Sequence, residues 1–330
     1  MKKTAYSVAI IGATGLVGGA VKSILAERRF PIKKLYLLAS KRSVDEEIED
    51  VEAFDFHQSQ ISFFCTGVEV SAKYIPRAVK CDNIVIDKSS HFRYEEDIPL
   101  IVPEVNEEVI KQYKNRNIIA NPNCTTIPIT VALKPIYDAV GISRINIATY
   151  QSVSGAGKNG VKELSDQTIR VLNGQDAKAK TFPQQIAFNV IPHIDDFEKN
   201  GYTREEMKLV WEIQKILGDE KIGINPTTAR VPVFYGHAAA LHIETKKKIT
   251  VEKAKKLLSE APGIKLIEGK YPYPTPVKEA SGKDWVYVGR LREDISSPKG
   301  LNLWVVADNL RKGAALNAVQ IAEKLVQSYL

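Results

Sequence analysis

The feature that most constrains the fold of this chain is a glycine-rich turn near its start, GATGLVG at residues 12–18. The turn follows an apolar run at 6–12 and opens a stretch, 15–29, whose apolar residues recur at helical spacing. An isolated glycine triplet also fits an ordinary strand–helix turn, but a flanking strand and helix favour nucleotide binding, with backbone amides facing a phosphate. The predicted cofactor-binding residues of this turn are Gly12, Thr14, Gly15, Leu16, Val17 and Gly18.

The rest of the first third repeats this alternation of β-rich and helical stretches. Further apolar runs occur at 33–39, 61–67, 83–87 and 117–120. Strands separated by helical stretches predict βαβ units and a parallel, doubly wound sheet of the Rossmann-like α/β class. Each run ends in small or polar residues, and ligands collect beyond the carboxyl ends of such strands. We therefore expect a shared binding crevice at that edge.

The middle of the chain has a different pattern. Longer, more alternating runs at 144–155, 265–269, 284–294 and 301–309 predict a mostly antiparallel sheet with one exposed face. Residues 203–217 read as a helix opened by Thr203, with Glu206 completing a capping box. Apolar residues in the last segment form one helical stripe, so we expect that helix to pack on the first domain.

The length of the chain indicates how many domains it forms, and its composition indicates which class of protein it belongs to. A chain of 330 residues exceeds one typical core. We predict a nucleotide-binding domain of residues 1–125 plus the C-terminal helix 310–330, and an α+β domain of residues 126–309. Apolar residues make up 44% and charged residues 26% of the chain, which is typical of soluble globular proteins.

The cysteine content and the net charge indicate the cellular setting of the protein and exclude several classes of binding partner. Three cysteines without metal-like or disulfide-like spacing predict free thiols in a reducing, cytoplasmic setting and no metal site. The net charge of +7 is scattered and lacks the interleaved aromatics of single-strand binders, so we expect no nucleic acid partner. No run approaches ~18 apolar residues, so no membrane span is expected.

The loop after the second run, ASKRSVD, bears on which dinucleotide binds. A plain NAD site usually offers an acidic residue to the ribose here, whereas Ser40, Arg42 and Ser43 offer hydroxyls and a cation. These groups suit a 2′-phosphate, which favours NADP over NAD. The alternative is a solvated surface loop, and the acidic stretch that follows would weaken binding of a 2′-phosphate.

One cysteine occupies a suggestive place, in NPNCTTIP at residues 121–128. Cys124 follows an apolar run and precedes a helical one, and a helix N-terminus favours the reactive thiolate. It is either a small buried residue at a strand end or a nucleophile that forms a thioester. A nearby proton shuttle would fit the second reading. His237, which follows a glycine, is a candidate shuttle, although a core histidine is as plausible from the sequence.

Several motifs together indicate a family. The chain contains, in order, GATGLVG, DKSSHFR, VPEVN, NPNCTTIP, QSVSGAGKNGVKEL, MKLVWEIQKIL, RVPVFYGH and DNLRKGAALNAVQIAE. This set closely resembles the bacterial type of the aspartate-β-semialdehyde dehydrogenase family and spans nearly the whole chain. The resemblance implies reductive dephosphorylation of L-aspartyl-4-phosphate with NADPH, giving aspartate semialdehyde and phosphate in lysine, threonine and methionine biosynthesis. It also implies a catalytic and dimerisation role for the second domain, and a homodimer or tetramer.

The resemblance further implies roles for individual residues. Cys124 would be the nucleophile, His237 the general acid/base and Gln151 the residue that orients the intermediate. Arg230 would bind the substrate carboxylate and Glu212 its amino group. The implied phosphate ligands are Lys215, Arg93 and Asn123, and the implied contacts to the nicotinamide are Ser154, Gly155 and Asn309. Without the family, Lys208, Glu212 and Lys215 would read as a solvated helix face.

Two alternatives remain open at this point. N-acetyl-glutamyl-phosphate reductase uses similar chemistry, but it usually carries glycine at the position of Asn123 and has no free amine to bind. A non-catalytic, NADP-binding paralogue would typically lose the cysteine, whereas Cys124, Gln151, Arg230 and His237 are all present.

Overall fold

The computed structural model of the chain describes residues 5–44 and 46–330. The chain forms two compact units. Unit 1 comprises residues 1–123 and 314–330, and unit 2 comprises residues 124–313. In the described part of the chain, no helix is both long and apolar enough to cross a bilayer.

Unit 1 is built on a parallel sheet of six strands, as the alternation of strand and helix predicts. The strands run in the order β3-β2-β1-β4-β5-β6, and their central members are buried on both faces, as expected for a doubly wound sheet. The strands are β1 (Tyr6–Ile11), β2 (Ile32–Ala39), β3 (Ile48–Asp50), β4 (Ile61–Phe64), β5 (Ile84–Asp87) and β6 (Ile118–Ala120). The helices of unit 1 are α1 (Leu16–Glu27), α2 (Val68–Lys80), α3 (Pro103–Asn106) and α8 (Leu316–Ser328).

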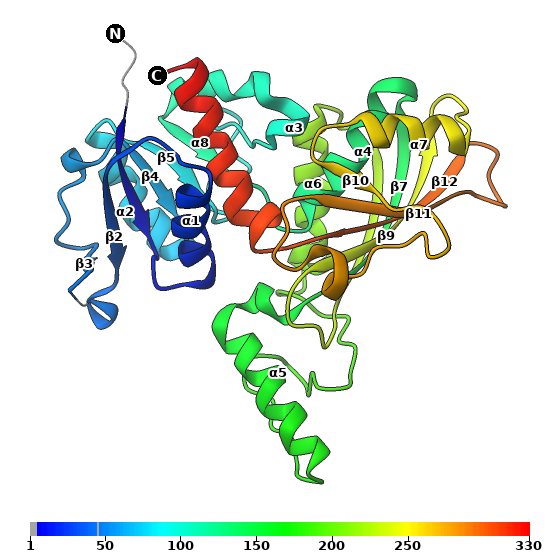
Figure 1. Cartoon of the computed structure of the whole chain (residues 1–330), viewed down its shortest axis with the longest axis horizontal. Coiled ribbons are helices and arrows are strands. Elements are labelled where there is room, and N and C mark those ends of the chain that lie inside the picture. Colours follow the sequence, from blue (N-terminus) through cyan, green and yellow to red (C-terminus); the bar gives the residue numbers. More distant parts are fainter. Residues whose placement is uncertain (1–4, 45) are drawn as a thin grey trace. The chain divides into compact units, whose positions relative to one another are not determined.

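The last helix of the chain belongs to this first unit. Its apolar stripe, which includes Val319, Ala322 and Leu325, is buried in one core cluster with β1 and α1. Figure 1 shows α8 next to α1 at the sheet of unit 1. Burial of this stripe against the first unit explains why a segment so distant in sequence completes it.

Unit 2 has a six-stranded, largely antiparallel sheet in the order β10-β11-β12-β9-β7-β8. The pairs at its two edges are parallel, and the three central pairs are antiparallel. The strands are β7 (Ile142–Gln151), β8 (Gly223–Arg230), β9 (His237–Thr245), β10 (Ile264–Leu266), β11 (Val286–Glu293) and β12 (Gly300–Ala307). The helices are α4 (Thr126–Val140), α5 (Gly157–Leu172), α6 (Arg204–Leu217) and α7 (Val251–Glu260).

Side chains alternate across the central strands of this second sheet. Ile145, Ile147, Leu241 and Ile243 are buried on one face, where α4, α6 and α7 contact the strands. On the other face, Asn146, Tyr150 and His242 are half-buried or exposed, whereas the end of this face near Ala238 and Val306 is buried. This alternation is the pattern expected for an antiparallel sheet covered on one side only.

The helix expected at 203–217 is confirmed, including its start. The Thr203 hydroxyl accepts from the Glu206 amide, and the Glu206 carboxylate accepts from the Thr203 amide, which completes the capping box. Helical stretches were expected where α2 and α4 lie, whereas α5 and α7 were not predicted from the sequence. In Figure 1, α5 extends away from the sheet of unit 2.

Candidate active site

The glycine turn of unit 1 is so closely packed that side chains are excluded from it. Gly12 has φ +84°, and a Cβ on it would lie 2.7 Å from the Cys65 carbonyl oxygen. A Cβ on Gly18 would lie 2.2 Å from the Gly12 carbonyl oxygen. Gly15 is the N-cap of α1, so the helix N-terminus carries no capping side chain that would compete with an anion. Thr14, Leu16 and Val17 complete the turn, and the arrangement fits a bound pyrophosphate.

The loop after β2 carries the groups that would distinguish the two dinucleotides. Ser40 is exposed and Ser43 is half-buried, both next to a short 3-10 turn at Lys41–Ser43. The side chain of Arg42 lies outside the described part of the structure. The preference for NADP over NAD therefore stays a prediction.

Arg93, a predicted phosphate ligand, is buried in unit 1 and ties two loops together. Its guanidinium donates hydrogen bonds to the carbonyl oxygens of Asn121, at 3.0 Å, and Lys88, at 2.6 Å. These loops follow β6 and β5, at the carboxyl edge of the sheet. Asn123, two residues beyond Asn121, is also buried.

Cys124 and His237 lie in contact within unit 2, although 113 residues separate them in the sequence. Cys124 Sγ is 3.4 Å from His237 Nε2. Cys124 precedes α4, whose N-terminal amides stabilise negative charge on the sulfur, and His237 is the first residue of β9. A Cβ on Gly313 would lie 3.2 Å from Cys124 Cβ and 2.8 Å from its carbonyl oxygen, so glycine leaves room for the cysteine there.

Hydrogen bonds from Ser152 define which ring nitrogen of His237 carries the proton. The Ser152 amide donates to His237 Nδ1 at 3.0 Å. Because Nδ1 accepts, a neutral ring must hold its proton on Nε2, the atom that faces the Cys124 sulfur. The ring therefore presents a donor to a thiolate.

Arg230 lies beside this pair and influences its charge state. Its guanidinium donates to the Ser152 carbonyl oxygen at 2.8 Å, so Ser152 contacts both Arg230 and His237. Burial, together with the positive charge of Arg230, lowers the pKa of His237 to about 3. Burial also lowers the pKa of Arg230 itself. The ring of His237 is consequently neutral at physiological pH.

Gln151 connects this cluster to helix α6. Its side-chain amide donates to Glu205 Oε1 at 3.1 Å, and its oxygen accepts from the Thr149 hydroxyl. Glu205 is in turn 3.1 Å from Lys208 Nζ. Burial opposes ionisation of Glu205, but the charges of Lys208 and Arg230 and the hydrogen bonds outweigh it and lower its pKa to about 2.

The structure therefore brings Glu205 and Lys208 to the site, a pair that the sequence analysis did not single out for the substrate. Glu212 and Lys215 repeat the same E-x-x-K spacing seven residues later, which is about 10 Å along a helix at ~1.5 Å per residue. Glu212 is completely buried and Lys215 is half-buried. The sequence of α6 contains two E-x-x-K pairs, and the pair at the start of the helix was the signal that could have identified Glu205.

The turn after Gln151 places the predicted nicotinamide contacts next to the site. Asn309 Oδ1 accepts from the hydroxyls of Ser152 and Ser154, each at 3.1 Å, and from the Gly236 amide at 2.9 Å. A Cβ on Gly155 would lie 2.7 Å from Arg230 Nη1 and 3.5 Å from His237 Nε2. A residue with a side chain at 155 would thus displace the arginine.

Taken together, unit 2 joins the Cys124 sulfur, a neutral imidazole and a cation in one cluster. Cys65, by contrast, is not a second reactive thiol, because burial raises its pKa to about 12. A cysteine next to an imidazole donor is suited to acyl transfer and aldehyde chemistry.

Comparisons with known proteins agree with this chemistry. Residues 7–113 match the family described as "Semialdehyde dehydrogenase, NAD binding domain", and residues 133–312 match "Semialdehyde dehydrogenase, dimerisation domain". The chain is 57% identical to aspartate-semialdehyde dehydrogenase 2 of Vibrio cholerae and 56% identical to the aspartate-semialdehyde dehydrogenase of Shewanella violacea, covering 98% of each chain.

A solved structure is equally similar. The crystal structure of aspartate semialdehyde dehydrogenase II from Vibrio cholerae, complexed with ASA, superposes with a TM-score of 0.97 at 56% identity. The match covers 99% of this chain and 100% of that chain. The chain therefore belongs to the aspartate-semialdehyde dehydrogenase family.

Proposed function

We propose that this protein catalyses the reductive dephosphorylation of L-aspartyl-4-phosphate to L-aspartate 4-semialdehyde and phosphate, with NADPH as the reductant. The observation that carries the proposal is the 3.4 Å contact between Cys124 Sγ and His237 Nε2 in a chain of this family. A bound nicotinamide dinucleotide supplies the hydride. The residues of the chain bind the substrate, form the acyl-enzyme and transfer the protons.

In the first step the Cys124 thiolate attacks the acyl carbon of the substrate. The carbon–sulfur bond forms, a tetrahedral oxyanion develops, and phosphate then leaves with the electrons of the carbon–oxygen bond, which leaves a thioester on Cys124. Gln151 lies beside the cluster and orients the acyl group. After reduction the thiohemiacetal collapses, releases the aldehyde and regenerates the thiolate.

Ser152 allows His237 to exist in two protonation states. Its amide satisfies Nδ1 of the neutral ring, and its hydroxyl oxygen lies 3.1 Å from the same nitrogen. The negative charge of a bound phosphate group raises the pKa of the ring. Once Nδ1 is protonated, the Ser152 hydroxyl can accept its hydrogen bond, and Nε2 can deliver a proton to the reacting oxygen.

The substrate is recognised through charge. Arg230 suits the α-carboxylate, because a guanidinium can bind a carboxylate with two parallel hydrogen bonds. We assign the substrate amino group to Glu205, which is ionised, and phosphate to Lys208, in place of Glu212 and Lys215. The hydrogen bonds of Glu205 with Gln151 and Lys208, and its proximity to Arg230, support this choice. The family resemblance adds the phosphate ligands Arg93 and Asn123.

Substitutions in the two E-x-x-K pairs test this assignment. Glu205→Gln and Lys208→Met should each lower kcat/KM by roughly 10- to 100-fold, because a hydrogen bond to a charged group contributes ~1.5–3 kcal/mol. Most of the loss should appear in KM for aspartate semialdehyde with Glu205→Gln, and in KM for phosphate with Lys208→Met. Lys215→Met is the matched control and should stay within a few-fold of the wild type. Equal losses at both lysines would contradict the assignment.

Cofactor choice and substrate choice are measured in one assay. Purified protein is given aspartate semialdehyde and phosphate, and absorbance at 340 nm is followed with NADP or NAD. We expect faster turnover with NADP, since Ser40, Arg42 and Ser43 suit a 2′-phosphate. N-acetyl-glutamate semialdehyde serves as the competing substrate. A preference for it would overturn the proposed function, and no turnover with either aldehyde would favour a non-catalytic paralogue.

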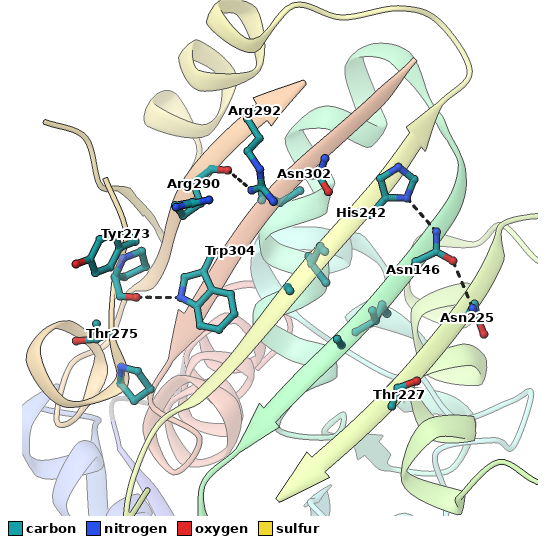
Figure 2. Close-up of a pocket in the computed structure, with 17 residues that line it drawn as sticks. Asn146, Asn225, Thr227, His242, Tyr273, Thr275, Arg290, Arg292, Asn302 and Trp304 are labelled. Carbon is teal, nitrogen blue, oxygen red and sulfur yellow. Dashed lines mark hydrogen bonds between the residues drawn. The ribbon is translucent and has the colours of Figure 1, made fainter. Parts of the chain in front are cut away.

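We also propose that the protein is a homodimer that pairs through the uncovered face of the second sheet. Figure 2 shows the residues there, which include Asn146 on β7, His242 on β9 and Trp304 on β12, around a cavity of about 670 Å³. Tyr150, whose ring contacts Trp304, is 40% exposed. The exposed Tyr150 and Tyr273 beside this cavity, within a matched dimerisation domain, support a second copy as the occupant.

A charged substitution in this face should weaken the dimer. Trp304→Glu introduces a carboxylate where the proposed interface excludes water, so the two-chain mass seen by sedimentation should shift towards one chain on dilution. Trp285, which is 45% exposed and does not line the cavity, provides the control Trp285→Glu. A wild-type monomer, or equal dissociation of both variants, would contradict this interface.

A further inference from the structure

A second group of reactive side chains lies in unit 1, outside the site described above. Asp55, His57 and Cys81 each offer one ligand atom, and these atoms all lie within 4.8 Å of one another. Asp55 and His57 flank the first residue of a 3-10 turn, Phe56–Gln58, that leads into β4. Cys81 is the C-cap residue of α2, just ahead of β5. A carboxylate, an imidazole and a thiol from two segments therefore converge.

The chemistry of this donor set selects a class of ion. Mg²⁺ and Ca²⁺ prefer oxygen ligands, whereas a combination of N, O and S donors suits a borderline ion such as Zn²⁺. Zinc binds each of these three groups at about 2.0–2.3 Å, and a three-ligand site leaves a position for water. We propose that Asp55, His57 and Cys81 form a binding site for Zn²⁺ or a transition metal of similar preference.

The two ligand-bearing segments are already held together by a buried side chain. Asn83, which is fully buried, donates to the Phe56 carbonyl oxygen at 2.6 Å and accepts from the Ser59 hydroxyl at 2.8 Å. It thus links the turn that carries Asp55 and His57 to a position two residues after Cys81. The Phe56 ring is buried against Phe54 and Phe64, which anchors the same turn. Such preorganisation reduces the cost of bringing ligands together.

The carboxylate is also oriented for a metal. Asp55 Oδ1 accepts from the His57 amide at 3.1 Å and lies 2.9 Å from His57 Nδ1. A metal would replace the hydrogen bond between the carboxylate and the ring, while the amide hydrogen bond would continue to fix the carboxylate.

The position of the site in unit 1 indicates what a bound metal ion would do. The turn precedes β4 and Cys81 precedes β5, so the ligands lie at the amino-terminal edge of the parallel sheet. The glycine turn lies at the opposite, carboxyl edge. A bound ion would therefore join two connections of unit 1 and shield the Cys81 thiol without occupying the dinucleotide turn. It would stabilise the folded chain, because a ligand that prefers the folded state raises its stability.

The test uses the full chain with Cys124→Ala, which removes the other thiol that contacts an imidazole. Co²⁺ is titrated as the probe, because a cobalt–thiolate bond gives a charge-transfer band, and Zn²⁺ affinity is measured by competition with a chromogenic chelator. We expect a single ion per chain and a cobalt–thiolate band. Cys81→Ser and His57→Ala should each weaken binding by at least about tenfold, the smallest loss expected from disturbing a metal site.

Matched controls separate this site from others in the chain. Cys65→Ser alters a different thiol and His91→Ala a different exposed imidazole, and both should leave Co²⁺ and Zn²⁺ binding unchanged. Zn²⁺ should also slow alkylation of Cys81, a readout independent of affinity. His57 is exposed, so His57→Ala should fold normally. Binding that survives Cys81→Ser, or weak binding shared equally by all variants, would overturn the proposal.

Discussion

Cys124→Ala should reduce turnover of aspartate semialdehyde by about 10⁴-fold or more, as expected when a covalent nucleophile is removed. Without the sulfur there is no thioester, and phosphate cannot exchange with the acyl group. The amides at the start of α4 and the Nε2 proton of His237 would have no anion to stabilise. The measurement is the 340 nm assay with the purified variant at high enzyme concentration.

The same variant should still bind the cofactor, because the glycine turn belongs to unit 1 and Cys124 to unit 2. The NADP dissociation constant, measured by fluorescence, should stay within a few-fold of the wild type. Cys65→Ser is the matched control. It changes a thiol whose raised pKa makes it unreactive, so this variant should keep most of the activity. Retained turnover with Cys124→Ala would refute the nucleophile role.

The sequence was most informative where a local pattern is sufficient to define a structure. The turn at Gly12 and Gly18 needs residues without side chains, and the capping box of α6 needs Thr203 and Glu206 three residues apart. Both could be read directly. The parallel sheet of unit 1 was predicted from short apolar runs that alternate with helical stretches. Strands buried on both faces of a parallel sheet consist almost entirely of apolar residues, which makes such runs easy to recognise.

The extent of α4 and the existence of α5 could not be recognised in the same way. Ten of the residues of α4 are buried, including both Ile127 and Leu133, and its charged residues Lys134 and Asp138 lie only in its second half, so its first half shows no polar face that would reveal a helical period. Helix α5 begins after a glycine-rich turn that reads as a loop. Both features depend on tertiary packing, which overrides local propensity.

Within the site, the sequence could not decide which E-x-x-K pair meets the substrate. Glu205 and Glu212 lie seven residues apart, hence on nearly the same helix face, and both are buried. Only the position of α6 relative to β7 brings Glu205 to Gln151. The role of Ser152 was equally hidden, because it depends in part on backbone groups that every residue has and otherwise on partners, His237 and Asn309, that are distant in the sequence.

His237 offers the second large effect, and two substitutions separate its possible contributions. In the resting state the ring donates a hydrogen bond from Nε2 to the Cys124 sulfur, since the Ser152 amide occupies Nδ1. A glutamine side chain can also donate a hydrogen bond, but it cannot take up and release a proton near neutral pH. Alanine can do neither.

If proton transfer is the main contribution, His237→Gln and His237→Ala should both lower kcat by about 10²–10⁴-fold, the usual range for general acid–base catalysis. Burial lowers the pKa of the ring to about 3 before substrate binds, so kcat/KM should not follow titration of a histidine near pH 6.5 in the free enzyme. The pH profile of kcat should instead show a histidine-dependent limb, because the phosphate group raises the pKa in the complex. A His237→Gln variant with activity within a few-fold of the wild type would show that donation to the sulfur is sufficient, and proton transfer would then have to be assigned to another group.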